Sequence, residues 1–193
     1  MNKACASISQ THEFVYNSKP YPFNLKIAST LSNRIEKYQH EFEQCKQIEL
    51  IKNERIKLSE DSIQSFVSFC QYQEIEITNN NVMDINFLAI EYDIPQLIEI
   101  TNQYIVQHNE LILKQFLFQL NNNKLNKNFY EEAISQRLVE FIEDNDLLKL
   151  PISSLYRIIQ KNSNLNVDIK FNFLCKCLKK FGKQASTLFS DFD

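Results

Sequence analysis

The side chains best suited to nucleophilic chemistry are the thiols, and Cys70 is the one most easily drawn in an active site. A cysteine hydrolase would pair a Cys70 thiolate with His108 as its general base. However, Ile63, Phe66 and Val67 place Cys70 on the apolar stripe of a helix. Thiols on such stripes are usually inert core residues. We therefore expect Cys70 to be buried and keep a small cysteine-dependent hydrolase only as an alternative function.

Metal chemistry has little support in the spacing of the ligand-type residues. Cys175 and Cys177 are separated by one residue, and no second cysteine pair with zinc-ligand spacing accompanies them. The three histidines, His12, His40 and His108, are scattered along the chain without a metal-binding motif. We expect Cys175 to be a core residue and predict no metal and no cofactor.

Charged residues gather in a few places. The acidic pairs Glu131–Glu132 and Glu143–Asp144 fall at helix ends or on polar faces, so we expect solvated carboxylates and no paired-carboxylate catalysis. A basic cluster lies toward the C-terminus and comprises Lys161, Lys170, Lys176, Lys179, Lys180 and Lys183. It favours a solvated face, or a face for an acidic partner. A nucleic-acid-binding helical protein is the other alternative function, and a net charge of -3 makes nucleic acid an unlikely partner.

The scarcity of glycine excludes several enzyme classes. Gly182 is the only glycine in 193 residues. Phosphate-binding loops and nucleophile elbows need several glycines for positive φ angles and close backbone approach. Neither a P-loop, a dinucleotide fingerprint nor a G-x-S-x-G motif is present. We therefore predict a protein that is not an enzyme.

The cysteine count and the N-terminal sequence indicate the compartment. The five cysteines are irregularly spaced, and the start "MNKACASISQ" lacks the apolar core of a signal peptide. No stretch has the roughly 18 apolar residues needed to cross a bilayer. We expect reduced thiols in a cytoplasmic protein, with the nucleus as the second choice, and no membrane association.

The N-terminal half has the pattern of a small sheet with helices. Residues 12–24 resemble a hairpin whose prolines, Pro20 and Pro22, suit an edge strand. A helix is expected over residues 25–42, and a short strand over residues 46–51 with Ile48 and Leu50 on one face.

The next segments alternate between capped helices and one more strand. Ser59 is a plausible N-cap for a helix that buries the Cys70 stripe. "EIEIT" (residues 74–78) alternates as a strand with Ile75 and Ile77 directed inward. Asn80 or Asn81 can cap the following helix, and Pro95 starts another that runs to about residue 107.

The C-terminal half is expected to be entirely helical. Helices are predicted over residues 111–120 and 130–143, and from Pro151. The last helix ends at Gly182, where a C-cap favours a left-handed residue. Its predicted buried stripe consists of Phe171, Leu174, Cys175, Leu178 and Phe181. The fold class is thus α+β, mostly α.

The order of elements is similar to that of the BTB/POZ domain. The resemblance rests on the segment "SIQSFVSFCQYQEIEITNNNVMDINFLAIEYDIPQLIEITNQYI". Its pattern predicts a helix, then a short strand, then a helix that begins at an Asn-Val pair. The segment "YEEAISQRLVEFIEDNDLLKLPISSLYRII" resembles the BACK helical region that follows many BTB domains, and "LKKFGKQASTLF" resembles the tail of protist BTB proteins in which ankyrin repeats come next. This resemblance implies an N-terminal tail over 1–10, a BTB/POZ-like domain over 11–107 and a BACK-like helical region over 108–193.

The resemblance also implies a function. BTB domains are protein–protein interaction scaffolds that self-associate or dock partners, and some are substrate adaptors of cullin-type E3 ubiquitin ligases. Cullin-binding members carry an apolar-x-Glu triplet before the middle strand, and Phe42, Glu43 and Gln44 occupy that place here, with glutamine as the third residue. The expected partners are therefore proteins: a second copy in a homodimer, or a cullin.

Overall fold

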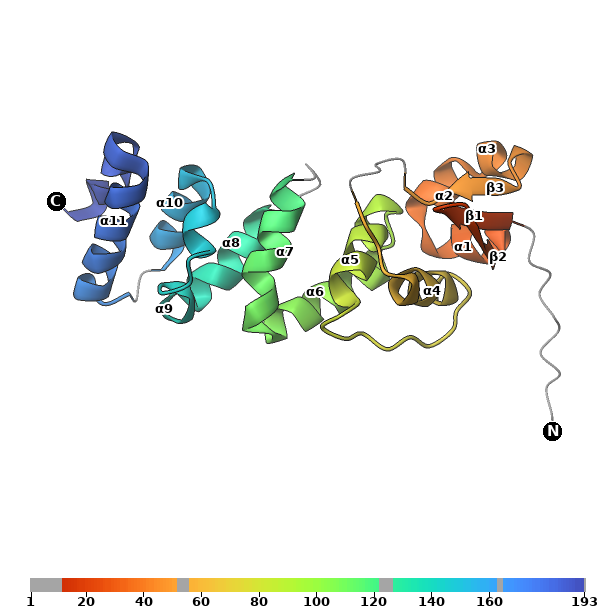
Figure 1. Cartoon of the computed structure of the whole chain (residues 1–193), viewed down its shortest axis with the longest axis horizontal. Coiled ribbons are helices and arrows are strands. Elements are labelled where there is room, and N and C mark those ends of the chain that lie inside the picture. The colour runs from red at the N-terminus through yellow and green to blue at the C-terminus, as the bar shows by residue number, and fades with distance from the viewer. Residues whose placement is uncertain (1–11, 52–55, 122–126, 163–164, 193) are drawn as a thin grey trace. The chain divides into compact units, whose positions relative to one another are not determined.

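The computed structural model describes residues 12–51, 56–121, 127–162 and 165–192; the predicted tail over 1–10 lies outside them. The chain divides into two compact units, residues 1–104 and 105–193. The division falls within helix α6 (Pro95–Gln107), the helix that ends where the sequence places a domain boundary. The described residues are mostly helical with one small sheet, so the α+β, mostly α class is confirmed (Figure 1).

Three short strands form the sheet of the first unit, in the order β2-β1-β3. Strands β1 (His12–Tyr16) and β2 (Lys19–Phe23) form the predicted antiparallel hairpin. Its two turn residues, Asn17 and Ser18, both have positive φ, as a turn matched to the twist of the strands requires. The two prolines of β2 lie on the sheet edge as predicted, and β3 (Gln47–Glu49) pairs with β1 in parallel.

The helix predicted over residues 25–42 is broken into three pieces. These are α1 (Leu25–Leu31), α2 (Asn33–Lys37) and α3 (Gln39–Gln44). The first break occurs at Ser32, whose extended backbone ends α1 while its hydroxyl caps α2 by accepting from Ile35 N at 3.0 Å. The same hydroxyl donates to the carbonyl of Tyr92, so a contact distant in sequence fixes the break.

Capping signals in the sequence locate two of the next three helices. Ser59 caps α4 (Glu60–Phe69) by accepting from Ser62 N, and Pro95 opens α6, both as predicted. Helix α5 (Val82–Glu91) follows Asn81, but the Asn81 side chain makes no bond to the helix. It instead accepts from Thr78 N at 2.8 Å and donates to the carbonyl of Glu76 at 2.9 Å.

An aromatic cluster forms the core of the first unit. Phe14 stacks on Phe23 with ring centroids 4.0 Å apart, and Tyr92 meets Phe14 edge-on at 5.2 Å. Phe66 from α4 completes the cluster 5.4 Å from Tyr92. The Tyr92 hydroxyl donates to the carbonyl of Leu50 at 3.0 Å, which satisfies its only buried polar atom within an apolar site.

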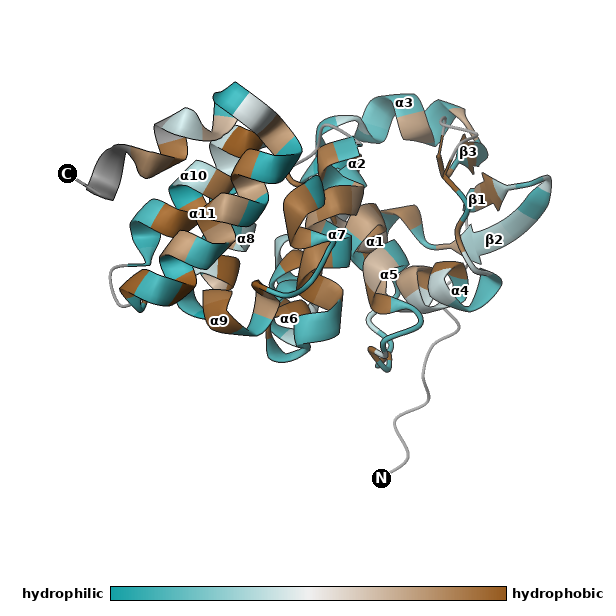
Figure 2. Cartoon of the chain, turned by 60° about the vertical axis from the view of Figure 1, so that its left-hand side comes forward, coloured by the Kyte–Doolittle hydropathy of each residue, from teal (hydrophilic) through white to brown (hydrophobic). Residues whose placement is uncertain are grey.

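The second unit is built from helices alone in the residues that the structure describes. Its elements are α7 (Asn109–Asn121), α8 (Lys127–Gln136), α9 (Leu138–Phe141), the 3-10 helices η1 (Leu147–Lys149) and η2 (Gly182–Phe192), α10 (Ile152–Lys161) and α11 (Val167–Phe181). Helix α8 packs between α7 and α10 (Figure 1). The helix predicted over residues 130–143 breaks at Arg137, which separates α8 from α9. Figure 2 shows brown and teal residues alternating along these helices, as amphipathic helices require.

One acidic residue was placed wrongly by sequence reasoning. Glu131, expected to be solvated, is fully buried in α8. Arg157 of α10 holds its carboxylate through two hydrogen bonds, at 2.7 and 2.6 Å. Glu132 beside it is exposed and pairs with Lys161, as a solvated carboxylate would.

The sequence prediction of which face of α11 is buried is also wrong. Phe173, Leu174 and Cys177 are buried, whereas Phe171 and Leu178 are exposed and Cys175 is only half-buried. The buried face is therefore rotated by about a quarter turn from the predicted stripe, at 100° per residue. The end of α11 is as predicted, because Gly182 has φ of 57° at the C-cap.

None of the described helices is both long enough and apolar enough to cross a membrane.

Candidate interaction groove

The alternating segment Glu74–Thr78 is not a strand, which corrects the sequence prediction. Its burial does alternate: Ile75 and Ile77 are half-buried, and Glu74 and Glu76 are exposed. Yet none of the described strands pairs with it, and the sheet contains β2, β1 and β3 only. The backbone N–H groups of residues 74–77 donate to no other group in the part of the chain that the structure describes.

Hydrogen bonds at both ends fix this segment in place. At its start, Gln73 N donates to the carbonyl of Ser68, which closes the turn after α4. At its end, the Asn81 side chain bridges Glu76 and Thr78, as described above. The segment therefore runs between two anchored ends across the surface of the first unit.

A shallow groove lies beside the anchored segment, with a volume of about 430 Å³. It is lined mainly by apolar side chains of α1, α4, α6 and the segment itself. We name it the Tyr72 groove, and its lining residues are Leu31, Phe69, Tyr72, Gln73, Glu74, Ile75, Ile77, Gln96 and Ile100. Two of them are large hydrophobic residues left open to solvent: Tyr72 is 65% exposed and Ile100 is 44% exposed. Exposed apolar surface that is contiguous with a groove is typical of a contact site for another macromolecule.

Tyr72 itself has a strained backbone. Its φ is 58°, in the left-handed region that costs a non-glycine residue about 1–2 kcal/mol. Its hydroxyl lies 2.7 Å from that of Thr30 on α1, so the exposed ring is held by its far end. Strain of this kind is retained where the surrounding structure fixes it and often accompanies function. The groove thus presents a positioned aromatic side chain, the residue type most enriched at protein interfaces.

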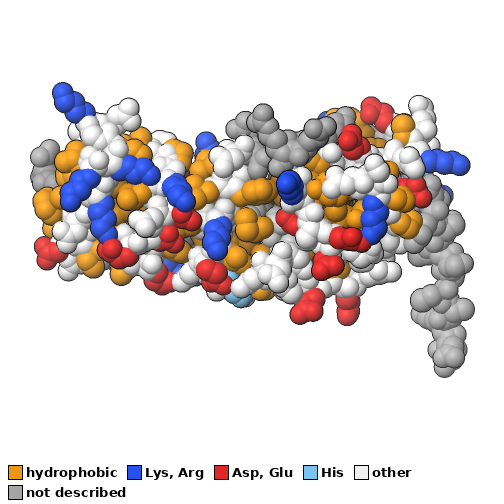
Figure 3. Space-filling view, viewed as in Figure 1, with side chains coloured by type: hydrophobic (Ala, Val, Ile, Leu, Met, Phe, Trp, Pro, Cys, Tyr) orange, Lys and Arg blue, Asp and Glu red, His pale blue; other side chains and the backbone are white. Residues whose placement is uncertain are grey.

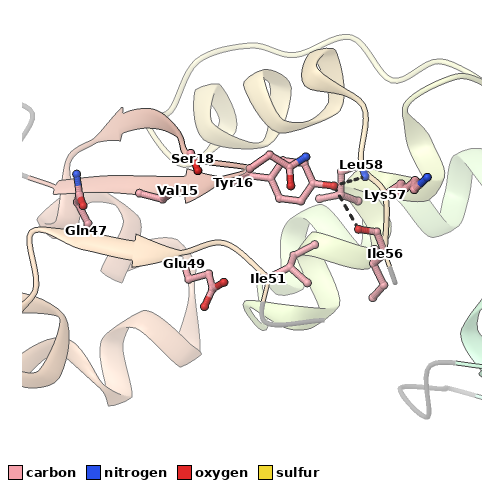
Figure 4. A pocket seen from close by; sticks show the side chains of 10 residues that line it. Val15, Tyr16, Ser18, Gln47, Glu49, Ile51, Ile56, Lys57 and Leu58 are labelled. Carbon is pink, nitrogen blue, oxygen red and sulfur yellow. Dashed lines mark hydrogen bonds between the residues drawn. The ribbon is translucent and has the colours of Figure 1, made fainter. Parts of the chain in front are cut away.

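A second pocket, of about 860 Å³, opens between the hairpin, β3 and residues 56–58 (Figure 4). Tyr16 crosses it, accepting from Leu58 N at 2.9 Å and donating to the carbonyl of Ile56 at 3.2 Å. Its described lining includes one acid, Glu49, and one base, Lys57, but neither a cysteine nor a histidine. With the Tyr16 hydroxyl occupied by backbone groups, the other hydroxyl in the described lining is that of Ser18, and no histidine in that lining could activate it; the Tyr72 groove is the better candidate.

Two of the four described thiols, Cys70 and Cys177, have the environments of core residues. Cys70 is fully buried as predicted, and burial raises the pKa of its thiol far above the usual range. Burial also raises the pKa of Cys177 to about 11. A thiol with a raised pKa is a poor nucleophile at neutral pH. Cys70 and His108 belong to different compact units, and among the described residues of the first unit no base makes a hydrogen bond to this sulfur.

The remaining predicted residues lie on the surface. Phe42, Glu43 and Gln44 form the last turn of α3 directly before β3; Phe42 is half-buried and the other two are exposed. Glu43 accepts from Gln39 at 3.0 Å and lies 3.6 Å from His40. These three residues line neither of the two pockets above.

Five of the six clustered lysines fall into two groups, and the sixth, Lys170, is half-buried on α11. Lys161 and Lys176 form ion pairs with Glu132 and Glu143, so their charges are partly balanced. Lys179, Lys180 and Lys183 are exposed at the end of α11 and the start of η2. No group of three or more histidine, cysteine or acidic residues within the described ranges is placed to hold a metal ion.

The sequence did not reveal the Tyr72 groove. Period-2 alternation predicts extended backbone, but it does not say whether a neighbouring strand exists. The sequence does place apolar residues at 72, 75, 77 and 100, but that they are exposed or half-buried is known only from the structure.

No family model matches the chain, and a search of the curated proteins finds no match to it.

Proposed function

We propose that the chain is a non-catalytic protein–protein interaction module of the BTB type, and that the Tyr72 groove is its contact surface. The observation that carries this proposal is the groove itself: exposed Tyr72 and Ile100 flank an anchored segment in which the backbone N–H groups of residues 74–77 donate to no described group. Contact sites of this composition bind by shape and apolar burial, and need no reactive side chain.

The architecture supports the BTB type. The first unit contains, in this order, a hairpin, a helical stretch, a third strand, a capped helix and two helices separated by a proline. A unit whose described elements are all helices follows, as in a BACK-like region. The proposed partners are a second copy of the chain, or a cullin in a cytoplasmic or nuclear ubiquitin ligase that docks near Phe42, Glu43 and Gln44.

The test combines oligomeric state with binding to purified cullins. Sedimentation velocity over a concentration series measures self-association, and a pull-down measures cullin binding. Ile100→Asp places a charge at the groove and is expected to reduce self-association strongly. Val139→Asp is the matched control, because Val139 is 56% exposed in the second unit and lies outside the groove.

Two results decide the proposal. Loss of association in Ile100→Asp, with Val139→Asp unchanged, supports the groove as the contact surface. A chain that stays monomeric at every concentration and binds no cullin would exclude both proposed roles.

A further inference from the structure

We propose that the Tyr72 groove binds a short peptide segment of a partner protein in which lysine or arginine residues alternate with apolar residues. This inference rests on the proposed function, since it names the chemistry of the partner for the same groove. It follows from the apolar lining of the groove, from the charges around it and from the backbone beside it.

The lining of the groove is suited to a few apolar side chains. Its volume of about 430 Å³ lies within the roughly 300–1,000 Å³ that ligand sites occupy. Ile75 and Ile77 of the anchored segment are half-buried, and Ile100 of α6 is 44% exposed. Apolar side chains of a ligand that cover these three residues would remove apolar surface from water on both partners.

The exposed charges of the elements that line the groove are mostly acidic. Glu74 lines the groove and Glu76 follows two residues later; both are exposed, and neither forms an ion pair within the described residues. Glu99, the only charged residue of α6, is exposed beside Ile100. Figure 3 shows acidic side chains gathered over the part of the first unit that holds α4, the segment and α5.

The bases near the groove do not balance these acids. Lys26 is the only charged residue of α1, and it lies about 140° around that helix from Leu31, the α1 residue in the lining. Arg34 at the start of α2 is paired with Glu91. The surroundings therefore favour a ligand that carries positive charge next to its apolar groups.

The ring of Tyr72 is a second reason to expect a cation. It is 65% exposed, and its hydroxyl lies 2.7 Å from that of Thr30, which limits its motion. Among the described lysines and arginines, none lies over this ring. An ammonium or guanidinium group of a ligand is attracted to the face of such a ring.

The backbone of the segment favours a peptide over a lipid or a small apolar molecule. The N–H groups of residues 74–77 donate to no described group, and a peptide brings one carbonyl acceptor with each of its residues. Apolar and acidic residues alternate along the segment, as Ile75 and Ile77 do with Glu74 and Glu76. The side chains of an extended peptide also alternate, so alternating apolar and basic residues match both features.

Three fluorescently labelled synthetic peptides of about six residues test the inference on the full chain. The first alternates lysine and valine, the second alternates glutamate and valine, and the third alternates lysine and serine. Fluorescence anisotropy is expected to show the Lys–Val peptide binding at least about tenfold more tightly than the other two. Its affinity should decrease as salt is added, because exposed charges are screened over about 8–10 Å at physiological ionic strength.

Charge reversal of the segment gives the sharper comparison. Glu74→Lys with Glu76→Lys should weaken the Lys–Val peptide at least about tenfold and strengthen the Glu–Val peptide, and this gain shows that the variant is folded. Glu36→Lys with Glu41→Lys is the matched control, because it changes the net charge equally at exposed residues outside the groove. The control should bind all three peptides as the unmodified chain does.

A neutral change tests the apolar part of the contact. Ile100→Ser should weaken the Lys–Val peptide, because it removes apolar surface from the groove without altering charge. Val139→Ser makes the same kind of change at an exposed residue of the second unit and should leave the affinity unchanged.

The outcomes separate this inference from the proposed function. Selective binding of the Lys–Val peptide, reversed by the Glu74 and Glu76 changes only, supports it. Equal binding of the Lys–Ser peptide, equal loss in the charge control, or no binding of the Lys–Val peptide refutes it. In each of those cases the sedimentation and cullin experiments still decide the proposed function, because neither uses these peptides.

Discussion

The fully buried carboxylate of Glu131 receives two hydrogen bonds from the guanidinium of Arg157, at 2.7 and 2.6 Å. The pair joins α8 to α10 and raises the pKa of the arginine through its hydrogen bonds to Glu131. A bidentate pair of this geometry satisfies both carboxylate oxygens, which is the condition for burying a charge without a large penalty.

We expect Arg157→Met to lower the free energy of unfolding by about 3–5 kcal/mol, because it leaves a buried carboxylate without its partner. Replacing both residues by methionine should cost less than that single change, since no buried charge then remains. Lys161→Met, which breaks the exposed pair with Glu132, should cost much less than Arg157→Met, because exposed ion pairs add little to stability. Denaturant unfolding measures the free energy of unfolding of all three variants. If Arg157→Met costs no more than the double methionine variant, this account is wrong.

The hydroxyl of Ser32 joins two parts of the first unit. It caps α2 through Ile35 N and donates to the carbonyl of Tyr92, so Ser32→Ala removes both bonds from a buried site. We expect a loss of about 1–3 kcal/mol in the free energy of unfolding. Ser29→Ala is the control, since the Ser29 hydroxyl only returns to the carbonyl of Lys26 in its own helix. Equal effects of the two changes in thermal unfolding would count against the cap.

Replacing Tyr72 by glycine should separate strain from contact. Glycine adopts a φ of 58° without the steric cost, so the free energy of unfolding should rise by about 1 kcal/mol. The same change removes the exposed ring from the groove and should weaken partner binding. Tyr72→Phe keeps both strain and ring while losing the contact with Thr30. It should therefore bind nearly as the unmodified chain does, without the gain in stability.

Alkaline pH should destabilise the fold through its buried thiols. The pKa of Cys177 is raised to about 11 from an ordinary 9.0, and that of Cys70 is raised further. The folded state therefore holds these protons when the unfolded state has lost them. The stability that the thiols contribute is complete below about pH 9 and decreases as pH rises toward 11, by about 1.4 kcal/mol per pH unit for each thiol.

This dependence can be assigned by substitution. Cys177→Ala should reduce the loss of stability between about pH 9 and 10, whereas Cys45→Ala should not, because Cys45 is exposed. Equilibrium unfolding at several pH values gives the change in the free energy of unfolding per pH unit directly. If this pH dependence is the same in Cys177→Ala as in the unmodified chain, the thiol ionises alike in the folded and unfolded states.

Helix ends and the hairpin could be predicted from sequence because the interactions that fix them are local. Ser59 accepts a bond from a residue three positions on, Pro95 suits a first helical turn, and Gly182 takes a left-handed φ. The edge prolines of β2 are equally local, since proline lacks the N–H that a central strand must donate.

The groove and the buried ion pair could not be predicted in this way. Alternation at Glu74–Thr78 correctly indicated that Ile75 and Ile77 are less exposed than their neighbours, but the absence of a described strand beside the segment depends on where β1, β2 and β3 lie. Glu131 has the sequence context of a surface residue, and only the approach of α10 brings Arg157 to it.

The sequence by itself determined where most helices and strands occur and how several of them end, because backbone conformation follows from neighbouring residues. Tertiary structure alone decided which side of α11 is buried, that Ser32 breaks a helix, and that the alternating segment borders a groove. Each of these depends on free energy gained from residues distant in the sequence, and periodicity carries no information about which distant residue that will be.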